Sequence, residues 1–169
     1  MISESTFGLP IFKWDEPNKT ATDISKWVNS SQEKTSLLFC YSLGKAQRIL
    51  NEISKTNFIN NIYTHSSIYR MNNCYKKLGI DIIETKKLEQ TKNNSDLKGS
   101  LIILPPALNK NSSLKNFKDS QTGFASGWMS IRALRKRSGY DKGFSISDHA
   151  DWMAILRTIK ESEAKNVFF

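Results

Sequence analysis

Short continuous runs of apolar residues alternate along the chain with segments whose apolar residues recur at helical spacing. The runs are typical of buried strands and lie at residues 36–40 (SLLFC), 61–65 (NIYTH), 100–106 (SLIILPP) and 122–129 (TGFASGWM). The helical segments lie at residues 20–30, 43–53 and 68–78. Strands that alternate with helices predict an α/β fold, in which a mainly parallel sheet has helices on both faces.

Glycine and polar residues set the boundaries of these elements. Gly79 is expected to end the third helix, whose inward face is formed by Ile68, Met71, Tyr75 and Leu78. The polar span 84–99 has no clear period, and we expect it to be a surface connection within one domain.

Both ends of the chain resemble incomplete strands. The start MIS and the end NVFF are short and apolar, and an exposed Val-Phe-Phe end would leave an apolar edge. We therefore expect the chain to be a segment of a larger protein.

Composition favours one folded domain with a polyanionic partner. The 169 residues suffice for a core, and 25 basic against 16 acidic residues give a net charge of +9. A lysine-rich solvated surface would give the same total, so the distribution matters more. Arg132, Arg135 and Arg137 cluster beside Lys136 and Lys142. Such a cluster indicates a nucleic-acid surface more directly than the total does, with a solvated loop as the alternative.

Nothing in the sequence points to a membrane or to an oxidising compartment. No apolar run approaches the roughly 20 residues of a membrane helix, and the first residues lack the pattern of a signal peptide. Cys40 and Cys74 both lie in apolar segments. We expect them to be reduced core residues of a cytoplasmic protein.

Two turns at the ends of predicted strands are candidate nucleic-acid contacts. In YSLGKAQR, the candidates are Ser42 as a helix cap, Gly44 for close approach, and Lys45. In FASGWM, Ser126 and Gly127 end a strand, where α/β sheets place their ligand crevices. Each turn also has an ordinary structural interpretation, as a strand-to-helix turn or as a tight turn that carries a core tryptophan.

One of the two histidines of the chain stands in an unusual stretch, SISDHADW. His149 lies there between two aspartates, just before an amphipathic run. A hydrolase uses such an imidazole as a general acid or base. The alternative is a surface imidazole at a helix start, with Asp148 as cap or partner. Glu4, in ISESTFG, has the similar alternative of a surface glutamate in a turn, so these residues alone leave the choice open.

Four motifs in order carry a resemblance that covers essentially the whole chain. They are ESTFGLPIFKW at residues 4–14, YSLGKAQR at 41–48, FASGWM at 124–129 and GFSISDHADW at 143–152. In these motifs the chain resembles the metallo-β-lactamase/β-CASP nucleases, and more narrowly the bacterial DNA-ligase-associated exonuclease group, also labelled mRNA 3′-end processing factors. The resemblance implies three parts: residues 1–14 end a metallo-β-lactamase half, residues 15–142 form the β-CASP domain, and residues 143–169 return into the metallo-β-lactamase domain.

The resemblance also implies metal-dependent hydrolysis of phosphodiester bonds, exonucleolytic and on DNA rather than RNA. In the family two zinc ions activate water and polarise the phosphate. Their His-x-His-x-Asp-His ligands do not occur in this sequence, so we expect no metal ligand within the chain and no activity of the chain alone. His149 corresponds to the histidine that protonates the leaving oxygen, with Glu4 beside it to fix its tautomer.

The implied partners are nucleic acid, the missing metallo-β-lactamase half, and the DNA ligase and helicase of the same system. The expected nucleic-acid contacts are Ser42, Gly44, Lys45, Ser126, Gly127, Arg132, Arg135 and Arg137. Two other interpretations stay open: a non-catalytic nucleic-acid-binding module that kept the β-CASP cassette, and an RNA-processing nuclease.

Overall fold

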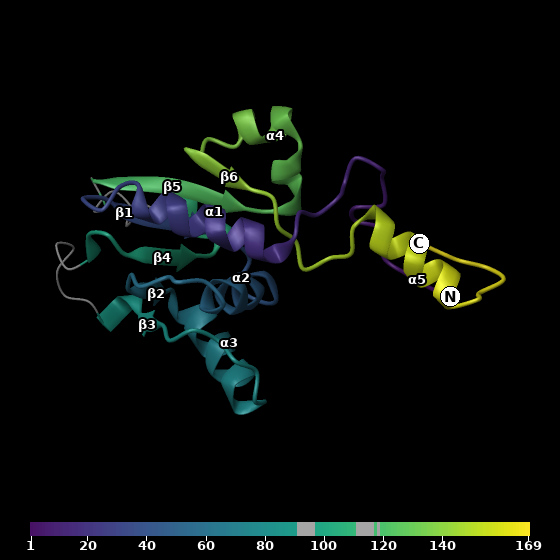
Figure 1. Ribbon diagram of the computed structural model, residues 1–169, viewed down its shortest axis with the longest axis horizontal. Coiled ribbons are helices and arrows are strands. Elements are labelled where there is room, and N and C mark those ends of the chain that lie inside the picture. Colours follow the sequence, from purple (N-terminus) through teal and green to yellow (C-terminus); the bar gives the residue numbers. More distant parts are fainter. Residues whose placement is uncertain (91–96, 111–116, 118) are drawn as a thin grey trace.

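The computed structural model describes residues 1–90, 97–110, 117 and 119–169. These residues form a six-stranded sheet with the order β3-β2-β4-β1-β5-β6 (Figure 1). The paired neighbours are parallel throughout. The strands are β1 (Thr35–Phe39), β2 (Ile62–Thr64), β3 (Lys86–Lys87), β4 (Leu101–Leu104), β5 (Ser120–Ala125) and β6 (Lys142–Phe144).

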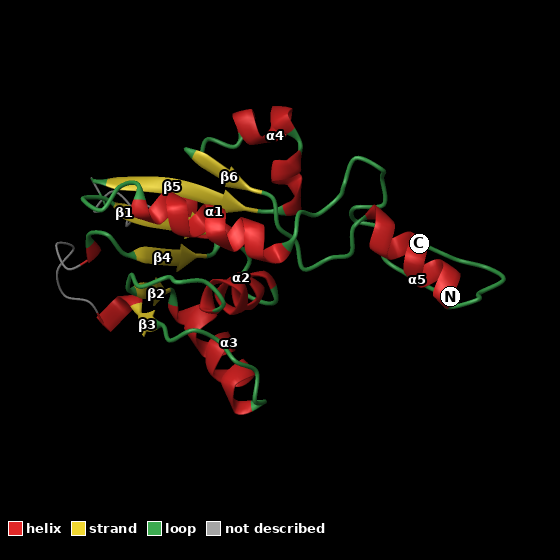
Figure 2. Cartoon of the chain, in the orientation of Figure 1, coloured by secondary structure: helices red, strands yellow, loops and turns green. Residues whose placement is uncertain are grey.

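Helices flank this sheet (Figure 2). The α-helices of the described residues are α1 (Pro17–Asn29), α2 (Lys45–Ser54), α3 (Ser66–Lys77), α4 (Arg132–Arg137) and α5 (Trp152–Glu161). Short 3-10 helices include η1 (Leu88–Gln90), η3 (Pro106–Lys110) and η5 (Gly127–Ser130). The α/β class with a parallel sheet, expected from the alternation of strands and helices, is confirmed.

The central strands follow directly from their apolar sequences. All 5 residues of β1 and all 4 residues of β4 are buried. A strand covered on both faces has no polar side to present to water, so its apolar residues run without alternation. Each fully buried leucine or isoleucine contributes about 1.5–3 kcal/mol relative to exposure. This burial is consistent with the position of β1 inside the sheet, between β4 and β5.

Helices α1, α2 and α3 cover one face of the sheet, as their helical spacing predicts. Ile24 of α1 and Ile68 of α3 are completely buried there. The end of α3 differs from the prediction, because this helix extends away from the sheet (Figure 1). Leu78 is 77% exposed, and the other two expected core positions, Met71 and Tyr75, are only partly buried.

The chain leaves two neighbouring strands toward opposite faces. After β1 it enters α2 on the first face. After β5 it passes through η5 and α4 to Tyr140, whose ring stacks 5.0 Å from that of Phe124 on the second face. Strands β1 and β5 are adjacent and parallel. Connections that diverge in this way open the carboxyl ends of the two strands to a ligand.

Beyond β6 the chain leaves the sheet and forms an arm together with the N-terminal segment (Figure 1). Helix α5 lies in this arm. At its start, Asp151 accepts hydrogen bonds from the Ala154 amide (2.8 Å) and from the Trp14 amide (3.0 Å). One carboxylate therefore caps α5 and also holds the N-terminal segment beside the chain that leaves β6.

Some predicted strand boundaries are wrong. The strand expected at residues 122–129 ends at Ala125. The Ser126 hydroxyl accepts the Trp128 amide (3.4 Å) and thereby starts the 3-10 turn η5. The edge strands β3 and β6 could not be predicted from the sequence. They are only 2 and 3 residues long and each begins with an exposed lysine, so no hydrophobic periodicity can be recognised in them.

The polar span 84–99 is described only in part, and the surface connection expected for residues 91–96 lies outside the described residues. On either side of it, strand β3 pairs with β2, and Leu97 is buried on the second face of the sheet. The domain boundaries expected after residues 14 and 142 stay predictions, and strand β6 runs across the second of them.

The two cysteines differ in environment. Cys40 is buried as predicted, and this burial raises the pKa of its thiol to about 12. Cys74 is exposed, so the prediction of a second core cysteine is wrong. It lies two positions after the buried Asn72 on α3, and residues two apart point to different sides of a helix.

Candidate active-site pocket

A cavity of about 620 Å³ lies at the carboxyl ends of β1, β5 and β6. It is lined by residues from the turns after these strands and from the N-terminal segment: Thr6, Phe7, Tyr41, Ser42, Leu43, Lys45, Ser126, Trp128, Asp148 and His149. Four residues expected at the site from the sequence therefore meet here, namely Ser42, Lys45, Ser126 and His149.

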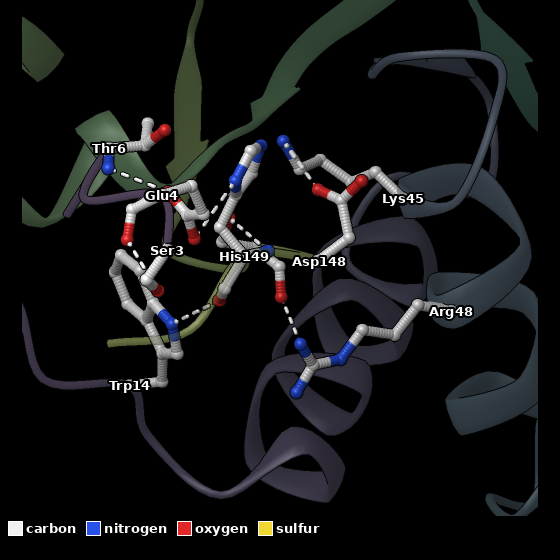
Figure 3. Close-up of polar contacts among 9 residues, drawn as sticks. Ser3, Glu4, Thr6, Trp14, Lys45, Arg48, Asp148 and His149 are labelled. Carbon is white, nitrogen blue, oxygen red and sulfur yellow. Dashed lines mark hydrogen bonds and ion pairs between the residues drawn. The ribbon is translucent and has the colours of Figure 1, made fainter. Parts of the chain in front are cut away.

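His149 pairs with Glu4 at this cavity (Figure 3). The Nδ1 atom of His149 lies 3.3 Å from Oε1 of Glu4, and the side chains are 43% and 44% exposed. Because the carboxylate engages Nδ1, the other ring nitrogen, Nε2, is the one left for a ligand. An imidazole held in this way keeps one tautomer and one orientation, as an acid–base group requires.

Hydrogen bonds to the backbone hold both members of the pair. The Thr6 amide donates to Oε2 of Glu4 (2.7 Å). The His149 amide donates to the Ser147 hydroxyl (3.1 Å), and the indole Nε1 of Trp14 donates to the His149 carbonyl (3.0 Å). The imidazole is thus placed by two segments that lie far apart in the sequence.

The pKa of Glu4 lies below its ordinary value of 4.5. Partial burial opposes ionisation, but the hydrogen bonds from Thr6 and the nearby His149 outweigh it. Glu4 is therefore an anion at neutral pH and serves as a hydrogen-bond acceptor for the imidazole.

The turn between β1 and α2 depends on Gly44. Its backbone angles are φ 77° and ψ −67°, and the Lys45 amide donates to the Leu43 carbonyl (3.0 Å). These are the features of a γ-turn with positive φ, which is rare and strained. A Cβ atom at Gly44 would also lie 2.7 Å from Oδ2 of Asp148. The positive φ favours glycine here, and a side chain would in addition meet the Asp148 carboxylate.

Lys45 and Asp148 form a second ion pair at the cavity. Nζ of Lys45 lies 3.1 Å from Oδ1 of Asp148, and the two side chains are 5% and 33% exposed. The same ammonium lies 5.1 Å from the centre of the Tyr41 ring, within the range of a cation–π contact. Figure 3 shows His149 between Glu4 on one side and this pair on the other.

Ser42 does not cap α2, so that prediction is wrong. The γ-turn inserts Leu43 and Gly44 between Ser42 and the helix, which leaves Gly44 at the cap position and no capping side chain among the described residues. The Ser42 hydroxyl lies instead 3.1 Å from that of Ser67, and its carbonyl accepts a hydrogen bond from Gln47 Nε2 (3.1 Å). Ser42 still lines the cavity.

Gly127 permits an aromatic cluster to form beside His149. A Cβ atom at Gly127 would lie 2.6 Å from Cζ of Phe7 and 2.7 Å from Cη2 of Trp14. The Phe7 ring centre lies 4.8 Å from that of Trp14, 5.1 Å from that of Trp128 and 5.9 Å from that of His149. Gly127 therefore faces these rings, and its contact with nucleic acid stays a prediction.

The three arginines lie on α4, and all are exposed. None of these arginines is among the described residues that line the 620 Å³ cavity. Arg135 and Lys136 line a separate cavity of about 310 Å³ near Tyr140. The role of Arg132, Arg135 and Arg137 in nucleic-acid binding stays a prediction.

The second histidine also has a glutamate neighbour, which sequence reasoning missed. Nδ1 of His65 lies 2.8 Å from the Ser67 hydroxyl, and Nε2 lies 3.8 Å from Oε1 of Glu89. Glu89 also accepts the Ser66 amide (2.9 Å), and His65 accepts the Ser67 amide (3.2 Å). These bonds to the first amides of α3 make the His65–Glu89 pair a helix cap.

Within the described residues, no three His, Cys, Asp or Glu side chains come together to hold a metal ion. The residues present therefore do not fit a zinc site, which needs three or four such ligands. No helix in the same ranges is long and apolar enough to cross a membrane.

Comparison with known proteins shows a distant relationship to a DNA ligase. No family model matches the chain. A probable DNA ligase from Opitutus terrae is 23% identical over 169 residues, which cover 99% of this chain and 16% of that ligase. The chain therefore spans less than one fifth of the length of that relative.

Proposed function

We propose that this chain is part of a DNA-processing hydrolase that cleaves phosphodiester bonds, with His149 as its general acid. One observation carries the proposal: His149 Nδ1 lies 3.3 Å from Glu4 Oε1, at a cavity on the carboxyl edge of a parallel sheet. The net charge of +9 supports it, because DNA is a polyanion. The distant relative supports the DNA assignment through its name.

In this proposal, the chain contributes a proton donor to the reaction. When a water or hydroxide oxygen attacks the phosphorus, the bond from phosphorus to the leaving oxygen breaks and that oxygen gains negative charge. In the imidazolium form of His149 both ring nitrogens carry protons; the Nε2 proton passes to this oxygen, while Nδ1–H stays hydrogen-bonded to Glu4 and the ring becomes neutral. Such a donor contributes about 10²- to 10⁴-fold to the rate.

Activation of the attacking water is assigned to groups beyond the described residues. The resemblance to metallo-β-lactamase/β-CASP nucleases implies two zinc ions, and the described side chains do not fit such a site. We place the zinc ligands in a metallo-β-lactamase half outside these residues, with DNA ligase and helicase as further partners. The contribution of this chain is the acid and one wall of the DNA cleft.

A non-catalytic DNA-binding module is the second candidate. The net charge of +9 suits it equally, because binding a polyanion needs no catalytic group. The two candidates differ in what His149 does: in the module it contributes to binding alone, whereas in the hydrolase it also donates the proton that cleavage needs.

The test uses the natural polypeptide that carries this segment, assayed for cleavage of DNA and of a nitrophenyl phosphodiester. His149→Ala should slow DNA cleavage about 10²- to 10⁴-fold. The nitrophenyl ester should lose far less, because its leaving group needs little protonation. His65→Ala is the matched control, since it removes the imidazole of a His–Glu pair that caps α3.

Equal losses on both substrates would contradict the acid role of His149. Undiminished DNA cleavage by His149→Ala would contradict it as well. A polypeptide that binds DNA and cleaves neither substrate under any metal condition would support the binding module instead.

A further inference from the structure

Two chemically different groups of residues line the 620 Å³ cavity. One group is large and exposed: Tyr41 is 59% exposed, Leu43 62% and Trp128 43%. The other group forms the ion pairs of Lys45 and His149. Large apolar side chains gathered in the open at a pocket mark a binding site, because covering them removes apolar surface from water. The ligand should therefore join a flat apolar group to an anionic one.

Trp128 is held in place before any ligand binds. Its ring centre lies 5.1 Å from that of Phe7 and 5.5 Å from that of Phe12. Its amide donates to the Ser126 hydroxyl (3.4 Å), and Gly127 allows the rings to approach the turn. A ring that is already fixed loses little conformational entropy when a flat ligand stacks on it.

Lys45 supplies the cation beside the Tyr41 ring. Lys45 is 5% exposed, yet its side chain lines the cavity. An ammonium has three N–H donors, and the Asp148 carboxylate, 3.1 Å away, lies on only one side of it. A phosphate oxygen in the cavity gains charge-assisted hydrogen bonds from the remaining donors and from His149.

We propose that the cavity receives the unpaired terminal nucleotide of a single-stranded DNA end, with its base on Trp128 and Tyr41 and its phosphate between Lys45 and His149. This inference rests on the proposed function, because it sets the phosphate beside the acid. Stacking between protein rings needs a base that can leave the helix stack, which an unpaired base does more easily than one paired and stacked in a duplex. A volume of about 620 Å³ is also that of a pocket for one small molecule.

The experiment measures binding of the 169-residue chain to a labelled linear oligothymidylate, to a circular oligothymidylate of the same length and to a blunt duplex. The linear strand should bind most tightly, because the circle has no terminal nucleotide and the duplex has no unpaired base. Trp128→Ala and Tyr41→Ala should each weaken linear-strand binding about 5- to 100-fold, the range for losing one base–aromatic contact. Trp128→Phe should restore most of it.

Leu78→Ala is the matched control, because Leu78 is 77% exposed on the distant end of α3. It should leave all three affinities unchanged. Circular dichroism of each variant checks folding, and Tyr41→Ala serves alone if Trp128→Ala does not fold. Duplex affinity should change less than twofold in every variant, since it depends on charge.

Equal weakening of single-strand and duplex binding by Trp128→Ala would overturn the stacking role. Equal binding of the linear and circular strands would overturn the preference for an end, and tighter binding of oligouridylate would overturn the assignment to DNA. These outcomes are independent of the leaving-group test. A chain that shows the expected dependence on Trp128 but equal losses on both phosphodiesters would lose only the acid role of His149.

Discussion

Nζ of Lys45, on a side chain that is 5% exposed, lies 3.1 Å from Oδ1 of Asp148. The pair joins the first residue of α2 to the chain that leaves β6. Removal of an ammonium from water disfavours its charged form, so the carboxylate beside it offsets a desolvation cost. The pair therefore holds the two strand ends together and keeps a cation at the cavity.

Asp148→Asn should lower the free energy of unfolding by about 1–3 kcal/mol, between the values for surface and buried pairs, because Asp148 is only partly covered. Urea denaturation measures it. Asp15→Asn is the matched control: Asp15 pairs with Lys19 at 2.9 Å, but both side chains are more than half exposed. It should cost much less, because solvent screens an exposed ion pair. Similar losses in the two variants would contradict a buried role for Lys45.

Gly44→Ala should cost about 2–4 kcal/mol, because the γ-turn is strained for an L-residue and the new methyl group would meet Asp148. Gly79→Ala is the control. It shares a φ of 77°, but a Cβ atom there meets nothing within 4 Å in the described structure, so only backbone strain of about 1–2 kcal/mol applies.

A double-mutant cycle separates the contact of Gly44 with Asp148 from the strain of the turn. In the Asp148→Ala background, the cost of Gly44→Ala should fall by the part that the contact contributes. An unchanged cost would mean that Asp148 yields without penalty and that the backbone alone requires glycine.

The fold was predictable where burial shaped the sequence. Strands β1 and β4 are covered on both faces, so their apolar runs stand out, whereas β3 and β6 lie at the edges and carry lysines. Ser126 ended its strand earlier than expected, since a side-chain hydrogen bond to the next turn has no signature in hydropathy.

Part of the cavity lining was predictable from the sequence, but the contacts between its residues were not. His149, Lys45 and Ser126 were expected from motifs at strand ends, and a parallel sheet brings such ends together. The pairing of Glu4 with His149 followed only from the family resemblance, because no local pattern relates two residues near opposite ends of a chain. The exposure of Trp128 depends on how its turn packs against Phe7 and Phe12 of the N-terminal segment, which local sequence patterns do not predict.

Glu4→Gln should show a pH-dependent loss of stability. The pKa of Glu4 in the folded protein lies below 4.5, so its carboxylate contributes stability that is fully present above 4.5. This contribution disappears as the pH falls through the lower folded value. The difference in unfolding free energy between the wild type and Glu4→Gln should therefore shrink below pH 4.5 in urea titrations. Glu33→Gln, at a side chain that is 90% exposed, supplies the baseline. A difference that grows on acidification would contradict the pairing.

Neutralising the arginines of α4 tests whether they contact DNA phosphates. Replacing Arg132, Arg135 and Arg137 by glutamine should lower the slope of log affinity against log salt by about 0.7–0.9 for each lost contact, because each contact releases one condensed counterion.

The control for these arginines removes the same charge elsewhere. Lys19, Lys55 and Lys98 each lie within 4.0 Å of a carboxylate of the protein. Their replacement by glutamine changes the net charge by the same amount, but the contact that is lost is to that carboxylate and not to a DNA phosphate. The slope should fall much less in this triple variant. Equal slopes in the two triple variants would mean that DNA responds to the total charge of the protein, and α4 would then not be part of the DNA-binding surface.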